Sequence, residues 1–175
     1  MENHRNSNIA PAIKVRDMEK SLVFYTKVLG FMTMDKLVRK NGKIAHASIG
    51  LDSPVLMLSP IDMVRTLTSK QQLKENKLGV GVSFHFRMTG TRTLDDYFVE
   101  IKRKGIRIVD EPKTEFWGDR IFTIEDPDGY TLTFSEHVHD VSPEARINAY
   151  ELAHPRRTRA SNGANMDAVK SLPVS

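Results

Sequence analysis

The chain has 175 residues, of which 39% are hydrophobic, and it contains no cysteine. This length and composition predict one domain, or two small modules that share a core. The missing thiols exclude disulfides, thiolate zinc sites, iron–sulfur clusters and cysteine nucleophiles. No apolar run is long enough for a transmembrane helix and no secretory signal is visible, so we expect a cytoplasmic protein without a membrane partner.

The net charge of +4 is concentrated in the C-terminal tail. Residues 155–175 carry Arg156, Arg157, Arg159 and Lys170 against the single acidic residue Asp167. A basic tail beside a nearly neutral body is not a basic groove, so we expect no nucleic-acid partner.

The first half of the chain predicts one strand, a helix and three more strands. After polar residues 1–7, which we expect to be disordered, residues 9–15 form the first predicted strand. Asp17 is a helix N-cap candidate, and Gly30 suits the left-handed end of that helix. Its apolar positions follow the spacing of one helix face: Met18, Leu22, Tyr25 and Leu29. Strands at 32–38, 43–51 and 55–59 follow, and Asn41-Gly42 predicts a hairpin between the first two.

The second half repeats this order after a connector at 61–78, which contains a predicted short helix at 62–75. Residues 80–88 alternate as a strand, and a helix follows from its cap Thr93 to Gly105. Strands at 106–109, 120–125 and 130–137 come next, with a type I turn predicted at 126–129. The equivalent places of Gly30 and Gly105 indicate a duplicated βαβββ unit.

These patterns predict three regions of different character. They are a disordered N-terminus at 1–7, a domain at 8–138 and a C-terminal helix with a loose basic tail at 139–175. Within the domain, module 1 covers about 8–60 and module 2 about 79–138, on either side of the 61–78 connector. Ser142-Pro143 predicts the start of the C-terminal helix.

Two segments resemble signature segments of the vicinal oxygen chelate superfamily, the group of glyoxalases, bleomycin-resistance proteins and dioxygenases. They are AIKVRDMEKSLVFYTKVLGF at 12–31 and FWGDRIFTIEDPDGYTLTFSE at 116–136. The resemblance implies an α+β fold in which two βαβββ modules form a curved mixed-sheet cleft of the glyoxalase/bleomycin-resistance type. It also implies a homodimer, because members of this superfamily often dimerise.

Catalytic members hold a divalent metal with His, Glu or Gln side chains on the first and last strands of each module. In this sequence those positions fall on Ala10, Met57, Ser83 or His85, and Thr133. A methyl group donates no electron pair, and a thioether is a poor ligand in a nitrogen–oxygen site. We therefore expect neither a metal nor another cofactor.

Strand alternation places a mixed set of side chains on the predicted cleft. Apolar surface is expected from Met57, Trp117 and Phe122, and positive charge for a carboxylate or phosphate from Arg87 and Arg120. The full set of predicted ligand-binding residues is His46, Met57, His85, Arg87, Trp117, Arg120, Phe122 and Thr133. Structural roles remain alternatives, with Trp117 packed at a module seam and Arg120 paired with Glu125 or Asp119.

Three interpretations of the function follow from these patterns and from the resemblance. The first is a metal-independent small-molecule binding protein that sequesters a drug or metabolite, as bleomycin-resistance proteins do. The alternative is a glyoxalase- or dioxygenase-related enzyme with a displaced metal site on His46, His85 and His137, or with His46 or His85 as catalytic base. A third reading is a scaffold whose 141–175 extension contacts a partner.

Overall fold

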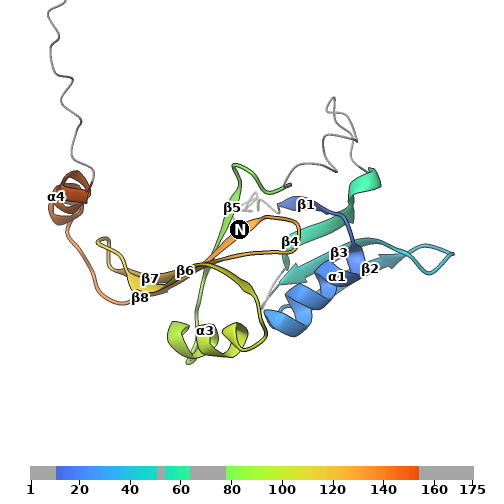
Figure 1. The fold of residues 1–175 in the computed structure, drawn as a ribbon, viewed down its shortest axis with the longest axis horizontal. Coiled ribbons are helices and arrows are strands. Elements are labelled where there is room, and N and C mark those ends of the chain that lie inside the picture. Colours follow the sequence, from blue (N-terminus) through green and yellow to red (C-terminus); the bar gives the residue numbers. More distant parts are fainter. Residues whose placement is uncertain (1–10, 51–53, 64–77, 154–175) are drawn as a thin grey trace, which may run out of the picture. The chain divides into compact units, whose positions relative to one another are not determined.

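The computed structural model describes residues 11–50, 54–63 and 78–153. The chain divides into two compact units, Met1–Asp140 and Val141–Ser175 (Figure 1). The first unit contains both βαβββ modules, and the second contains the helix α4 (Pro143–Ala153). No helix among the described residues is long and apolar enough to cross a membrane.

Module 1 is a four-stranded mixed sheet covered by one helix. Its elements are β1 (Ala12–Val15), α1 (Met18–Val23), the π-helical turn η1 (Phe24–Val28), β2 (Met32–Val38), β3 (Ile44–Gly50), β4 (Pro54–Pro60) and the 3₁₀ turn η2 (Ile61–Met63). The strand order is β1-β4-β3-β2, with β1 parallel to β4 and the other pairs antiparallel. The predicted N-cap is confirmed, because the Asp17 side chain accepts hydrogen bonds from the backbone N–H groups of Glu19 and Lys20.

Module 2 repeats this topology. Its elements are β5 (Ser83–Arg87), α3 (Leu94–Lys102), β6 (Arg107–Thr114), β7 (Asp119–Glu125) and β8 (Thr131–His137), in the sheet order β5-β8-β7-β6. Thr93 caps α3 as predicted, since its side chain accepts a hydrogen bond from the N–H of Asp96. Gly30 and Gly105 both adopt positive φ, at 78° and 72°, as expected for residues that end the two helices.

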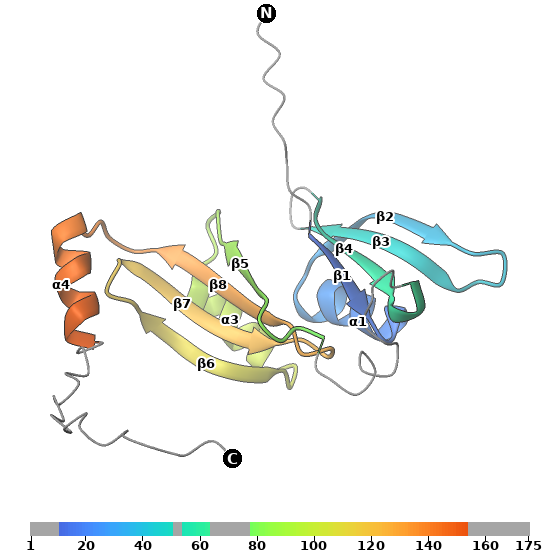
Figure 2. The same ribbon diagram turned by 90° about the horizontal axis from the view of Figure 1, so that it is seen from above.

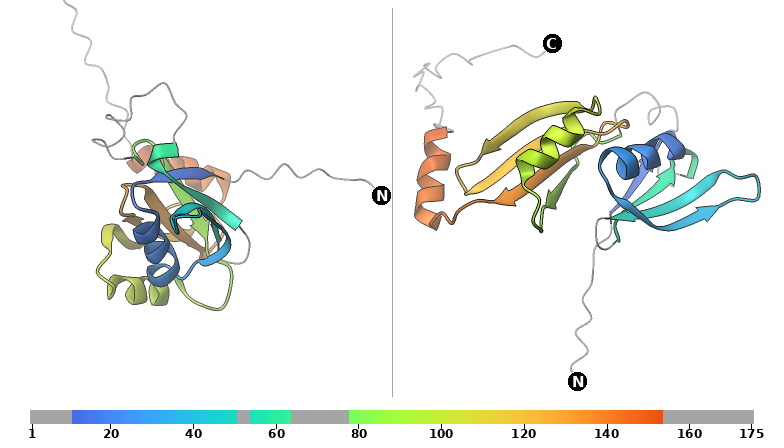
Figure 3. Two further views of the ribbon diagram at one scale, coloured as in Figure 1. Left: turned by 90° about the vertical axis from the view of Figure 1, so that its right-hand side faces the viewer. Right: turned by 90° about the horizontal axis from the view of Figure 1, so that it is seen from below.

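In each module the helix covers one face of the sheet and leaves the other face open (Figures 2 and 3). The hydrophobic core lies between helix and sheet, and it continues from one module into the other. Phe31 of module 1 contacts Phe86 of module 2 edge to face at 5.3 Å, and the Tyr97 hydroxyl donates to the carbonyl oxygen of Leu29 at 2.9 Å. The α+β fold of two βαβββ modules is thus confirmed.

The edge strand β6 differs most from its predicted bounds. It runs to Thr114 instead of ending at Val109, although the added residues are polar and include Pro112. An edge strand tolerates proline because one of its sides forms no ladder, and two register shifts against β7 accommodate the segment. The predicted helix from 143 is confirmed, whereas predictions for 1–7, most of 62–75 and 155–175 lie outside the described residues.

Candidate ligand-binding faces

The open face of the module 1 sheet carries polar side chains beside a thioether. His46 and Ser48 on β3 and Met57 on β4 are half-buried there, while their neighbours along each strand are buried under α1. The Nε2 atom of His46 lies 3.2 Å from the Ser48 hydroxyl, and Lys14 Nζ donates to the hydroxyl of Ser59 at 2.7 Å. Strand alternation therefore positions His46 and Met57 as predicted, on one face of one sheet.

The open face of the module 2 sheet is lined by β5, β8 and β7. His85 and Arg87 on β5 are exposed. Thr133, opposite His85 in the ladder, is buried, and its hydroxyl lies 3.2 Å from that of Thr123 on β7. The hydroxyl oxygen of Thr133 thus already has a hydrogen-bond partner, the hydroxyl of Thr123.

A pocket of about 390 Å³ opens at one end of this second face. Ser83, Glu125 and Thr131 line it together with the segment Gly79–Val82. Backbone groups and short polar side chains dominate this pocket, so it can accept a polar part of a ligand that lies along the sheet.

A chain of ionisable side chains crosses the opposite end of the same face. Arg87 Nη2 lies 3.7 Å from Asp119 Oδ2, and Asp119 Oδ1 lies 3.0 Å from His137 Nδ1. His137 Nε2 is 3.2 Å from the fully exposed carboxylate of Asp140. The sequence prediction missed Asp119 as a partner of His137. The two residues lie opposite each other in the antiparallel pair β7–β8. The predicted turn at 126–129 implied this pairing.

Arg120 lies on the helix-covered side of the module 2 sheet, contrary to the prediction that it lines the cleft. Its Nε and Nη2 atoms donate to the two carboxylate oxygens of Asp95 on α3, at 2.9 and 2.8 Å. This bidentate pair raises the pKa of the guanidinium further above its ordinary value. Neither of the partners considered from the sequence, Glu125 or Asp119, forms this contact.

Phe122 is likewise a core residue and not a cleft residue. It is fully buried, stacks on Phe134 at 5.1 Å and contacts the rings of Tyr97 and Phe98 on α3. Arg120 and Phe122 are two residues apart, so strand alternation places both on the helix side. Trp117 is half-buried in the β6–β7 turn, edge to face with Phe116 at 4.9 Å.

The side chains at the superfamily's metal positions do not fit a metal site. Ala10 lies outside the described residues, Met57 offers a soft thioether and Thr133 a neutral hydroxyl already bonded to Thr123. Ser83 or His85 would be the remaining donor, and one imidazole does not make a site that requires three or four donors. Among the described residues, no three His, Asp or Glu side chains are grouped to hold an ion.

Two buried carboxylates join the modules, and the sequence prediction treated them only as turn residues. Asp128 accepts hydrogen bonds from the Arg16 backbone and guanidinium, both at 3.1 Å, and from the Ser21 hydroxyl at 3.2 Å. Asp126 accepts one from the Tyr25 hydroxyl at 2.8 Å. Burial raises the pKa of the Asp126 carboxyl and that of the Tyr25 hydroxyl. These groups fix the position of the β7–β8 turn against α1 and lie away from both open faces.

Comparison with known proteins identifies the family. A family model described as Glyoxalase/Bleomycin resistance protein/Dioxygenase superfamily matches residues 9–134. Protein Mb0911c of Mycobacterium bovis is 23% identical over 134 residues, which cover 77% of this chain and 86% of that protein.

Two solved structures share the fold. TioX from Micromonospora sp. ML1 has a TM-score of 0.59 at 17% identity, covering 75% of this chain and 99% of that chain. TnmS3, an antibiotic binding protein from Streptomyces sp. CB03234, has a TM-score of 0.54 at 20% identity, covering 75% of this chain and 96% of that chain. On the match of the family model, this chain belongs to the Glyoxalase/Bleomycin resistance protein/Dioxygenase superfamily.

Proposed function

We propose that this protein binds a small molecule on the open faces of its sheets without the help of a metal ion, and so sequesters a drug or metabolite. The observation that carries the proposal is the side-chain chemistry at the metal positions of the superfamily, where Met57 and Thr133 stand. The shared fold of TnmS3, an antibiotic binding protein, supports the same class of function.

The chemistry of the open faces indicates the kind of ligand. On the module 1 face, Met57 supplies a half-buried apolar contact, and His46 on the neighbouring strand supplies a hydrogen-bonding group. On the module 2 face, Ile121 supplies a half-buried apolar contact. Arg87 is an exposed cation whose partner Asp119 is 3.7 Å away, at the long end of ion-pair distances. A ligand with an apolar or aromatic body and a carboxylate or phosphate fits this combination.

A homodimer in the cytoplasm completes the proposal. The helix of each module leaves one face of its sheet open, and a second copy would enclose a ligand on that face more fully. Size-exclusion chromatography with light scattering is expected to give about twice the chain mass of 19.9 kDa. A mass equal to one chain at micromolar concentration would contradict the dimer.

The first test concerns the metal. Protein purified without a histidine tag is expected to hold well below one transition-metal ion per chain by mass spectrometry. In a thermal-shift screen of aromatic antibiotics, glutathione conjugates and small acids, any stabilising ligand is expected to act equally with and without EDTA. One Ni, Zn, Mn or Fe per chain, removed by EDTA together with ligand binding, would contradict the proposal.

The second test uses two arginines on opposite faces of the same sheet. For an anionic ligand from the screen, Arg87→Gln is expected to weaken binding about tenfold or more, since a hydrogen bond to a charged group contributes about 1.5–3 kcal/mol. Arg120→Gln is the matched control, because its guanidinium is bonded to Asp95 on the helix side. If isothermal titration calorimetry showed that both variants change ligand affinity equally, the open face of module 2 would not be the binding site.

One observation favours the enzyme alternative, with a base different from those predicted. His137 is bonded through Nδ1 to Asp119, the arrangement that orients an imidazole for proton transfer. If this pair is catalytic, ligand recovered from the complex should be chemically changed, and His137→Asn should prevent the change without abolishing binding. Recovery of unchanged ligand from the unsubstituted protein favours sequestration.

A further inference from the structure

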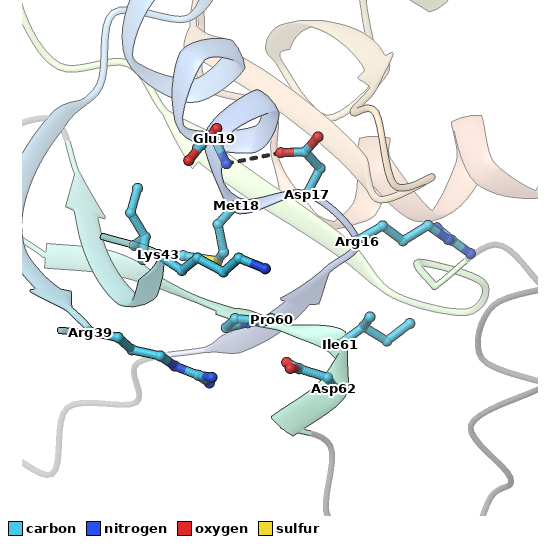
Figure 4. Close-up of a pocket in the computed structure, with 10 residues that line it drawn as sticks. Arg16, Asp17, Met18, Glu19, Arg39, Lys43, Pro60, Ile61 and Asp62 are labelled. Carbon is cyan, nitrogen blue, oxygen red and sulfur yellow. Dashed lines mark hydrogen bonds between the residues drawn. The ribbon is translucent and has the colours of Figure 1, made fainter. Parts of the chain in front are cut away.

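A second pocket lies in module 1 (Figure 4), and its lining includes none of the residues described on the two open faces. It has a volume of about 350 Å³ and is bordered by the start of α1, the β2–β3 hairpin, the end of β4 and η2. None of the eight residues predicted to bind ligand lines it. Its size is at the lower end of the range typical of small-molecule sites, roughly 300–1,000 Å³.

The pocket has an apolar floor. In Figure 4 the side chain of Met18, only 7% exposed, extends toward Pro60, whereas that of Ile61 points away from Met18. Ile44 completes the apolar lining. These side chains come from four different elements of module 1, so the folded module, and not one local segment, builds the floor.

Charged side chains surround this floor, and some of them already have partners. Arg16 is paired with Asp128 at 3.1 Å. The carboxylate of Asp17 is engaged as the N-cap of α1. Neither residue is therefore available to a ligand without loss of a structural contact.

The remaining charged residues of the lining are two cations and two carboxylates. Arg39 and Lys43 face each other across the β2–β3 hairpin, where the Arg39 N–H donates to the Lys43 carbonyl at 2.8 Å. In the described part of the chain, neither of these cations has a carboxylate within ion-pair distance. Glu19 on α1 and Asp62 on η2 supply the negative charge, also without an ion pair among the described residues.

We propose that this pocket binds a small zwitterion with an apolar middle, of the size of a dipeptide. Its carboxylate lies against Arg39 and Lys43, its ammonium group lies toward Asp62, and its apolar side chains cover Met18 and Pro60. Since Arg39 and Lys43 form no ion pair among the described residues, a ligand carboxylate can pair with them without breaking an existing ion pair. The carboxylates of Glu19 and Asp62 in turn disfavour a ligand that is only negative.

The test uses leucyl-leucine with free termini, its N-acetyl derivative and its C-terminal amide. In isothermal titration calorimetry at low salt, the free dipeptide is expected to bind, and each blocked analogue to bind at least tenfold more weakly. Heteronuclear NMR of methyl-labelled methionines, with the Met18 signal assigned by Met18→Leu, is expected to show the largest shift at Met18.

Variants of the charged pocket residues distinguish specific recognition of the dipeptide from a nonspecific effect of net charge. The double variant Arg39→Gln with Lys43→Gln, and separately Asp62→Asn, are expected to weaken dipeptide binding at least tenfold while thermal melting stays unchanged. Lys40→Gln is the matched control, because Lys40 lies on the same exposed hairpin but does not line the pocket.

Three results would overturn the proposal. They are no heat of binding with free leucyl-leucine at millimolar concentration, equal binding of the free and blocked forms, and an effect of Lys40→Gln as large as that of the double variant. Because the pocket shares no residue with the open faces, Arg87→Gln should leave dipeptide binding unchanged.

Discussion

The carboxyl group of Asp126 is fully buried where the β7–β8 turn meets α1. It accepts hydrogen bonds from the N–H groups of Asp128 and Tyr130, at 2.9 and 2.8 Å, and from the Tyr25 hydroxyl. These bonds favour the ionised form, but burial and the nearby charge of Asp128 act against it. Burial is the largest effect, so the pKa of Asp126 in the folded protein is above its ordinary value of 3.8.

This raised pKa predicts a pH effect of defined sign. The folded protein holds the Asp126 proton more tightly than the unfolded chain does, so this stabilisation is fully present below pH 3.8 and is lost as pH rises through the folded pKa. Asp126→Asn cannot titrate. The free energy of unfolding of the unsubstituted protein minus that of Asp126→Asn should therefore fall as pH rises from about 4.

Urea unfolding at half-unit steps between pH 4 and pH 8 measures this difference. Subtracting the variant cancels the titration of the other carboxylates. A difference that rises with pH would show that the hydrogen bonds from Tyr25 and the backbone outweigh the desolvation of Asp126.

At the scale of elements, the segment that leads into β5 packs its backbone at Gly79 directly against the backbone of the β7–β8 turn. A Cβ atom added to Gly79 would lie 2.3 Å from the carbonyl oxygen of Gly129, in the turn between β7 and β8. Such a contact forces one of the two backbones to move. The turn also carries Asp126 and Asp128, so its displacement would disturb the bonds between the modules.

Gly79→Ala is therefore expected to lower the free energy of unfolding by about 1–3 kcal/mol, the usual cost of overpacking. Val80→Ala is the matched control, because Val80 is 75% exposed one residue further along the chain. Chemical denaturation of both variants checks the expectation, and equal stabilities would mean that this contact relaxes without cost.

At the scale of the whole domain, the two modules share one continuous core. Besides the buried carboxylates, Lys104 Nζ of module 2 donates to the carbonyl oxygens of Lys27 and Val28 at the end of the module 1 helix, at 3.0 and 2.9 Å. Neither module keeps these contacts without the other. We therefore expect residues 11–140 to unfold in a single cooperative transition.

Two probes test this cooperativity. Trp117, the single tryptophan of the chain, reports on module 2 by fluorescence, and the methyl signal of Met18 reports on module 1 by NMR. Their urea midpoints should coincide. Separate midpoints would show that the modules are independent folding units.

Much of the fold could be predicted because its signals are local. Apolar spacing marks the buried faces of α1 and α3, and Asp17 and Thr93 mark where the two helices begin. The extension of β6 to Thr114 could not be predicted locally, because Pro112 is tolerated there only since β6 lies at the edge of its sheet. Alternation also placed His46 and Met57 on an open face, since side-chain direction follows directly from position in a strand.

The sequence by itself determined the duplicated βαβββ order, the helix caps and the absence of thiol chemistry, because each depends on neighbouring residues or on composition. Only the tertiary structure decided which partners distant side chains meet. It placed Arg120 against Asp95 and Phe122 in the core, joined Asp119 to His137, and brought Met18 and Pro60 to the lining of one pocket. Such pairings arise when separate elements pack, and no periodicity along the chain records them.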